Sequence, residues 1–139
     1  MKYYIRSKQY RASNVILEVN PLSAWSYAWW KFLARINGAV VFNGYNYSNS
    51  TCRHQSKVKA MLDKLGINID LYIECPSGLQ SANWLESTIE YHSREIQKLR
   101  EAIANPRSRA ETNKRRITEI EAHQVKIDTI QELTSRKVA

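Results

Sequence analysis

The sequence predicts an α+β fold, in which a small, mostly antiparallel sheet with one packing helix precedes a long, coiled-coil-like antiparallel helical hairpin. Short apolar runs separated by turn residues fill the first 50 residues. An amphipathic stretch follows over residues 51–65, and apolar residues then recur at heptad spacing from residue 85. We therefore expect a basic, aromatic-rich α+β domain over residues 1–80 and the hairpin over residues 81–139.

Two short strands are expected near the N-terminus. Residues 3–6 read YYIR and residues 14–19 read NVILEV, and both runs are rich in β-branched or aromatic residues. Asn20 and Pro21 should end the second run, because proline cannot donate to a strand ladder.

A hairpin around a two-residue turn is expected next. The dipeptide Asn37-Gly38 separates two apolar segments, and this dipeptide strongly favours a tight β-hairpin turn. Residues 29–36 and 39–47 should then form an antiparallel pair. A helix over residues 24–36 that stops at Gly38 is the alternative.

One short helix and one further strand complete the predicted domain. The helix should cover residues 51–65, with Ser50 or Thr51 as its cap and Gly66 as its left-handed stop. Apolar and polar residues then alternate strictly over residues 67–75, which predicts a half-buried strand.

Two long helices are expected in the C-terminal part, with Asn105-Pro106 as the break between them. Ser108 and Glu111 fit a capping box that restarts the second helix. In the register that the apolar positions favour, His92 would lie opposite Gln124 in a polar layer, and it could also approach His123. The apolar seams are Leu85, Ile89, Ile96, Leu99 and Ile103 in the first helix, and Ile117, Ile120, Ile127 and Ile130 in the second.

The net charge of +8 belongs entirely to the N-terminal half. Residues 1–62 hold nine Lys or Arg against one acidic residue, Glu18, whereas the remaining residues hold twelve of each sign. Such asymmetry favours a polyanionic partner, either nucleic acid or a nucleotide-like anion. A solvated basic surface without a partner is the alternative.

The sequence offers little support for a membrane, a disulfide or a metal. No apolar run approaches the roughly 20 residues that a membrane-spanning helix needs, and the N-terminus lacks the apolar segment of a signal peptide. Cys52 and Cys75 show neither a disulfide framework nor CxxC spacing. We expect a cytoplasmic protein with reduced cysteines, no metal and no cofactor.

The start of the predicted short helix is a candidate anion site. Helices usually begin with acidic residues, because free N–H groups give this end a partial positive charge, yet here basic residues stand at the start. A bound phosphate held by N–H groups, hydroxyls and cations would explain this choice. Solvent exposure of the cations and a buried structural histidine are the alternatives. The candidate residues are Ser48, Ser50, Thr51, Arg53, His54 and Lys57.

Aromatic residues cluster just before this helix start, where they could stack on unpaired bases. Eight Trp, Tyr and Phe residues lie between residues 25 and 47. Most should belong to the core, because a sheet covered by a helix needs bulky side chains. Tyr45 and Tyr47 lie nearest the helix start and are the best candidates for exposed stacking residues.

The tip of the helical hairpin is a second basic region. Arg107, Arg109, Arg115 and Arg116 could contact a nucleic-acid backbone there. A charge run at a loop can equally be no more than solvated surface.

The segment of residues 40–67 resembles small accessory proteins of tailed bacteriophages. It reads VVFNGYNYSNSTCRHQSKVKAMLDKLGI. In those proteins a Y-x-Y-S segment, a threonine and an H-Q-x-K-V helix follow an apolar strand. The resemblance implies expression in the cytoplasm of an infected bacterium, where host machinery or host defence is the target. It carries over no functional residue.

These observations favour a non-enzymatic binding protein of phage accessory or counter-defence type that engages nucleic acid or a nucleotide-like anion. One alternative is an inhibitor or adaptor of a host protein that acts through the hairpin, which could also form a homodimer. A second alternative is a metal-independent, toxin-like ribonuclease. In that case His54 would act as general acid or base while Arg53 and Lys57 stabilise the phosphorane.

Overall fold

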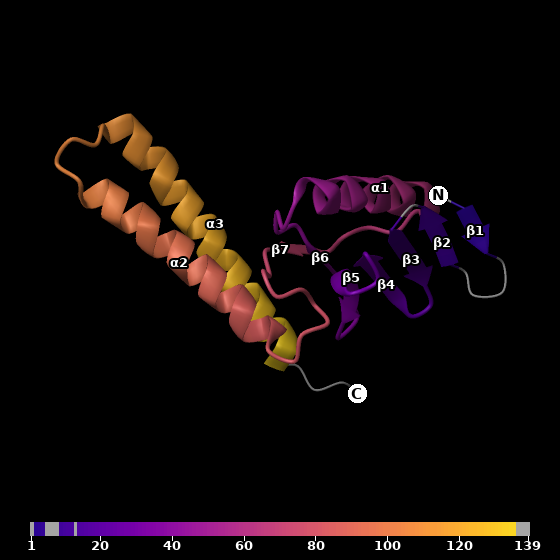
Figure 1. Cartoon of the computed structure of the whole chain (residues 1–139). Coiled ribbons are helices and arrows are strands. Elements are labelled where there is room, and N and C mark those ends of the chain that lie inside the picture. The colour runs from indigo at the N-terminus through magenta and orange to yellow at the C-terminus, as the bar shows by residue number, and fades with distance from the viewer. Residues whose placement is uncertain (1, 5–8, 13, 136–139) are drawn as a thin grey trace.

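The computed structural model describes residues 2–4, 9–12 and 14–135 (Figure 1). In this part of the chain a seven-stranded sheet and helix α1 precede a hairpin of two long helices, which confirms the predicted α+β fold. The elements are β1 (Lys2–Tyr4), β2 (Gln9–Ala12), β3 (Val15–Val19), β4 (Leu22–Ser26), β5 (Trp30–Ile36), β6 (Ala39–Asn43), α1 (Asn49–Leu65), β7 (Leu71–Ile73), α2 (Trp84–Ala104) and α3 (Ala110–Ser135).

The strands of the sheet follow one another in chain order, from β1 to β7. Neighbouring strands up to β6 are antiparallel. β7 pairs with β6 in parallel, since α1 forms the crossover that brings the chain back in the same direction.

The predicted β5–β6 hairpin is confirmed, and the alternative helix over residues 24–36 is wrong. Ile36 pairs with Ala39 across the turn. Asn37 has φ 46° and Gly38 has φ 86°, so both central residues lie in the left-handed region that an Asn-Gly turn favours. The second strand ends at Asn43, earlier than the predicted residue 47.

Two strands were missed by the sequence analysis. β2 reads QYRA, which alternates but is only four residues long, and β4 reads LSAWS, in which the alternation breaks at Trp25. β3 agrees with the strand expected over residues 14–19. Part of the first strand, expected over residues 3–6, lies outside the described residues.

Helix α1 begins earlier than predicted. Ser48 caps it, with an extended backbone at φ −163° and a side chain that accepts a hydrogen bond from the Thr51 N–H, so the expected cap at Ser50 or Thr51 is wrong. Gly66 ends the helix at φ 70°, as predicted.

The strand expected over residues 67–75 forms only at Leu71–Ile73. Ile67 and Ile69 pack on the core beneath α1 without joining the ladder. Asp70 ends the ladder, because its carboxylate accepts a hydrogen bond from the Val40 N–H at 2.7 Å.

The two faces of the sheet are covered by different elements (Figure 1). α1 covers one face, where Val58 and Leu62 pack against the strands. The base of the hairpin covers the β5–β7 end of the other face, where Ile130 and Leu133 of α3 join Val41 and Ile73. The hairpin is thus anchored in the core, and burial of these side chains contributes about 1.5–3 kcal/mol each.

The hairpin extends away from the sheet, so that the α2–α3 loop lies at its far end (Figure 1). His92 meets His123, so the register that placed Gln124 opposite His92 is wrong. The expected capping box is also wrong, because the Ser108 hydroxyl donates to the carbonyls of Ile103 and Asn105 at the end of α2. Among the described residues, no helix has the length and apolar character needed to cross a membrane.

Candidate nucleic-acid interface

Three aromatic side chains lie half-exposed beside the start of α1. The exposed fractions are 46% for Tyr27, 50% for Trp29 and 51% for Tyr47. The rings of Trp29 and Tyr47 meet edge to face, with centroids 5.5 Å apart. Large rings are mostly buried in folded proteins, so three neighbouring exposed rings indicate an interaction surface.

A strained turn between β4 and β5 presents two of these rings. Tyr27 has φ 54° and Ala28 has φ 63°, a left-handed conformation that costs a non-glycine residue about 1–2 kcal/mol. The Tyr27 N–H donates to the Asn14 carbonyl at 2.7 Å, which helps to hold the turn. Such strain is often found at binding sites, where the surrounding structure compensates for it.

Sequence reasoning missed Tyr27 and Trp29 as exposed residues and correctly favoured Tyr47. It assigned most of the eight rings to the core, which is wrong, because Trp30, Phe32 and Phe42 are buried and the other five are partly or largely exposed. The two rings were missed because β4 was not expected. Once β4 ends at Ser26 and β5 begins at Trp30, the residues between them must form a turn.

The first turn of α1 is tied to the sheet by buried polar side chains. The Ser26 hydroxyl lies 2.6 Å from His54 Nδ1 and 3.4 Å from the Thr51 hydroxyl. The Ser48 hydroxyl in turn donates to Thr51 Oγ1 at 3.1 Å. Ser48, Thr51 and His54 therefore have structural partners, as expected for the alternative in which His54 is a buried structural residue.

Residues of the first three turns of α1 border a hollow of about 210 Å³. Ser50, Arg53 and Lys57 line it from α1, with Asn14 and Tyr27 opposite and the buried His54 at one wall. Neither Arg53 nor Lys57 forms an ion pair with an acidic residue in the described part of the chain. The first turn of α1 contains no acidic residue, so these charges are available to an anion.

His54 adds no positive charge to this hollow at neutral pH. Burial lowers the pKa of His54, and the nearby positive charge of Lys57 lowers it further. The ring is 6% exposed and packs edge to face against Tyr27 at 5.1 Å. His54 thus supports Tyr27 and the helix start from beneath.

Tyr45 lies apart from the other predicted residues. Its ring meets Tyr91 of α2 edge to face at 5.6 Å, and its carbonyl accepts a hydrogen bond from the Gln55 side chain. Together with residues of α2 it lines a separate hollow of about 430 Å³. Tyr45 therefore helps to seat the hairpin and does not join the exposed rings.

The four predicted tip residues lie at the far end of the hairpin, about 30 Å from its base by helix length. Arg107, Arg109 and Arg115 are exposed. Arg116 instead donates to the Ala102 carbonyl near the end of α2, where a positive charge complements the helix dipole. The predicted residues thus occupy three separate places, at the α1 start, beside α2 and at the tip.

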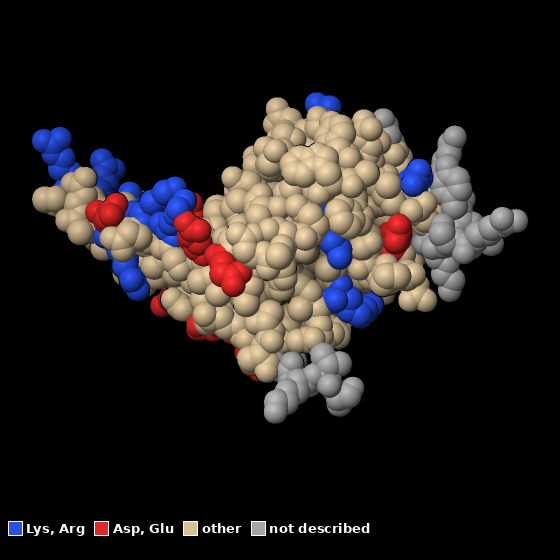
Figure 2. All heavy atoms as spheres, turned by 60° about the horizontal axis from the view of Figure 1, so that its bottom comes forward, with Lys and Arg blue, Asp and Glu red and all other residues tan. Residues whose placement is uncertain are grey.

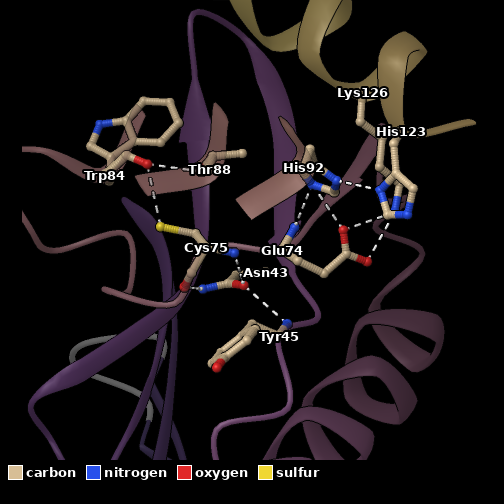
Figure 3. A network of polar contacts seen from close by, with 9 residues as sticks. All are labelled: Asn43, Tyr45, Glu74, Cys75, Trp84, Thr88, His92, His123 and Lys126. Atoms are coloured by element: carbon tan, nitrogen blue, oxygen red, sulfur yellow. Dashed lines mark hydrogen bonds and ion pairs between the residues drawn. The ribbon is translucent and has the colours of Figure 1, made fainter. Parts of the chain in front are cut away.

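A polar junction joins the sheet to both long helices (Figure 3). Glu74 follows β7, and its carboxylate lies 3.0 Å from Nε2 of His92 in α2 and 2.9 Å from Nζ of Lys126 in α3. His92 is fully buried, and its Nδ1 lies 2.8 Å from Nδ1 of His123. Such a short contact needs one nitrogen to donate and the other to accept, so one proton lies between the two rings.

The charge of Glu74 is stabilised by its partners. Burial alone would raise the pKa of Glu74, but hydrogen bonds and positive charge from His92 and Lys126 outweigh it and lower the pKa to about 2. Burial lowers the pKa of His123, and the neighbouring His92 lowers it further. An ionised Glu74 between these groups therefore holds the hairpin on the sheet.

The described residues contain no group of three or more His, Cys, Asp or Glu side chains that could hold a metal ion. Cys75 is buried and Cys52 is partly exposed, and both are free thiols. Comparisons with protein-family models, with curated proteins and with solved structures found no match to this chain.

Proposed function

We propose that the protein is a non-enzymatic binder of nucleic acid or a nucleotide-like anion. The binding site would be the α1-start surface, which we define as Tyr27, Trp29, Tyr47, Arg53 and Lys57. The observation that carries this proposal is the contact of half-exposed aromatic rings with a helix start whose cations lack acidic partners among the described residues.

The two halves of this surface suit the two parts of a nucleotide. Aromatic rings stack on bases of any identity, and each stacked base contributes about 1–3 kcal/mol. Arg53 can hold a phosphate with two parallel N–H groups, whereas Lys57 acts as a point charge. With the cap at Ser48, Arg53 lies in the second turn of α1, so the helix dipole adds little to its contact with a phosphate.

Substitution of both cations tests this assignment. We expect Arg53→Gln with Lys57→Gln to weaken binding of a fluorescein-labelled oligonucleotide about tenfold or more at low salt, because two phosphate contacts are lost. Fluorescence anisotropy measures the affinity. Lys64→Gln with Arg100→Gln is the matched control, since it removes the same charge from exposed positions elsewhere. Equal affinities of the two variants would rule out this site.

A protein partner at the hairpin is the second candidate function. Ile117 is 48% exposed and Val125 is 61% exposed on α3, whereas Ile127 and Ile130 face the core. Exposed apolar residues on a helix suit a second copy of the chain or a host protein, as the resemblance to phage accessory proteins implies. If a second copy binds there, light scattering should give the mass of a dimer, and Ile117→Lys with Val125→Lys should give a monomer. A monomeric wild-type chain would exclude the dimer.

A further inference from the structure

In the described part of the chain, neither α1 nor the hairpin packs on the sheet around Trp25. Ser26 directs its hydroxyl to His54 of α1, so the preceding residue, Trp25, points to the opposite face. At the β5–β7 end of that opposite face, Ala34 and Val41 are covered by the base of the hairpin. Trp25 belongs to neither core cluster and is only partly buried.

Pairing across the strands places a basic and aromatic row on this region. Arg11 of β2 pairs with Ile16 of β3, Ile16 pairs with Trp25 of β4, and Trp25 pairs with Lys31 of β5. Directly paired residues share one face of a sheet. The row therefore crosses four strands, about 14 Å in width, with a cation at each end and apolar surface between them.

A hollow adjoins the Lys31 end of this row. Its volume is about 460 Å³, and Lys31 and Arg35 line it together with Ser23 and the β3–β4 turn at Asn20 and Pro21. The lining also includes the apolar Val19, Leu22 and Ala34, and its two cations suit a phosphate or a sugar-phosphate. The Lys31 ammonium lies 5.7 Å from the centre of the Trp25 ring, so one side chain links the hollow to the aromatic surface.

The charge around this row is mostly positive. Glu18 is the sole acidic residue in the first 62 residues, and its carboxylate accepts a hydrogen bond from the Gln9 side chain at 2.9 Å. Figure 2 looks toward this side of the molecule, where Lys and Arg lie over the sheet with little acidic surface, whereas both signs mix on the hairpin. The charge thus favours an anionic ligand.

We propose that this open face, made of Arg11, Ile16, Trp25 and Lys31, is a second binding surface that takes an unpaired nucleic-acid strand. A base stacks on Trp25, and the strand's phosphates contact the cations on either side. A phosphate in the hollow attracts the Lys31 ammonium away from the Trp25 ring, so that a base can stack on this ring. An unpaired strand is required, because the faces of bases within a duplex are already stacked.

The open face shares its ligand class with the α1-start surface but none of its residues, so the two proposals can fail separately. The probes are a labelled oligothymidine and a labelled duplex of the same length. Trp25→Leu should weaken binding of oligothymidine about tenfold or more, and Arg11→Gln with Lys31→Gln should reduce it similarly. Both changes should weaken binding of the duplex less than they weaken binding of oligothymidine.

The α1-start variant, Arg53→Gln with Lys57→Gln, serves as the comparison. If the open-face variants bind oligothymidine as the wild type does while this variant binds weakly, the open face is wrong and the proposed function stands. The reverse result supports the open face and removes the α1-start surface. No binding by the wild type overturns both proposals, and equal affinity for duplex and single strand overturns stacking on Trp25. Arg11→Gln with Lys31→Gln keeps the tryptophan in place, so the test holds even if Trp25→Leu misfolds.

Discussion

At the start of α1, some side chains hold the helix in place and others face the solvent. Ser48 caps the helix with its side chain, Thr51 Oγ1 accepts a hydrogen bond from the Ser48 hydroxyl, and His54 is bonded to Ser26. Arg53 and Lys57 are left exposed on the neighbouring positions of the helix. A buried, hydrogen-bonded layer beneath exposed cations is a suitable arrangement for an anion site, because it fixes the direction of the backbone N–H groups.

Ser26→Ala tests whether the buried layer holds the helix start. The change leaves His54 Nδ1 without its buried partner, so the free energy of unfolding should fall by about 1–3 kcal/mol. Urea denaturation measures it. Ser56→Ala, at an exposed position of α1, should stay within about 0.5 kcal/mol of the wild type. Equal stability of the two variants would mean that the Ser26 hydroxyl contributes nothing.

At the scale of elements, the sequence predicted the features that depend on only a few neighbouring residues. The Asn37-Gly38 turn, the Gly66 stop and the break near Asn105 depend on the conformations that a few residues favour, and all three are found. β2 and β4 form because they pair with neighbouring strands. The sequence of one segment does not show this pairing. The start of β7 likewise depends on the contact between Asp70 and Val40.

The candidate site was predictable in part for the same reason. Tyr47, Arg53 and Lys57 lie on or beside a helix that the sequence reveals. Tyr27 and Trp29 join them only through the three-dimensional path of β4 and β5. The junction of Glu74 with His92, His123 and Lys126 unites three elements, and only the approach of His92 to His123 was foreseen.

The junction predicts a dependence of stability on acid. The pKa of Glu74 is lowered from 4.5 to about 2 in the folded chain, so the unfolded chain takes up the proton first. The stabilisation is complete above the unfolded pKa and is lost as pH falls from about 4.5 toward about 2. Glu74→Gln should therefore cost at most about 3 kcal/mol at neutral pH and progressively less in acid.

Urea denaturation at several pH values measures this effect. Glu119→Gln on the exposed side of α3 is the control, and its cost should be small at every pH. A stability difference between Glu74→Gln and the wild type that stays constant across the acidic range would show that the carboxylate does not hold the hairpin.

At the scale of the whole molecule, three of the places where the described residues expose positive charge could bind an anion. These are the α1-start surface, the open face of the sheet and the hairpin tip with Arg107, Arg109 and Arg115. The tip lies at the end of the hairpin that is far from the sheet (Figure 1). A polymer could contact more than one of these places at once, whereas a mononucleotide could occupy only one.

The salt dependence of oligonucleotide binding tests the central claim most directly. The logarithm of the association constant should fall linearly with the logarithm of the salt concentration, by about 0.7 for each phosphate of a single strand that is neutralised. We expect Arg53→Gln with Lys57→Gln to make this slope shallower by about 1.4, because two such contacts are removed. An unchanged slope, with Lys64→Gln and Arg100→Gln as control, would contradict the claim that nucleic acid binds at the start of α1.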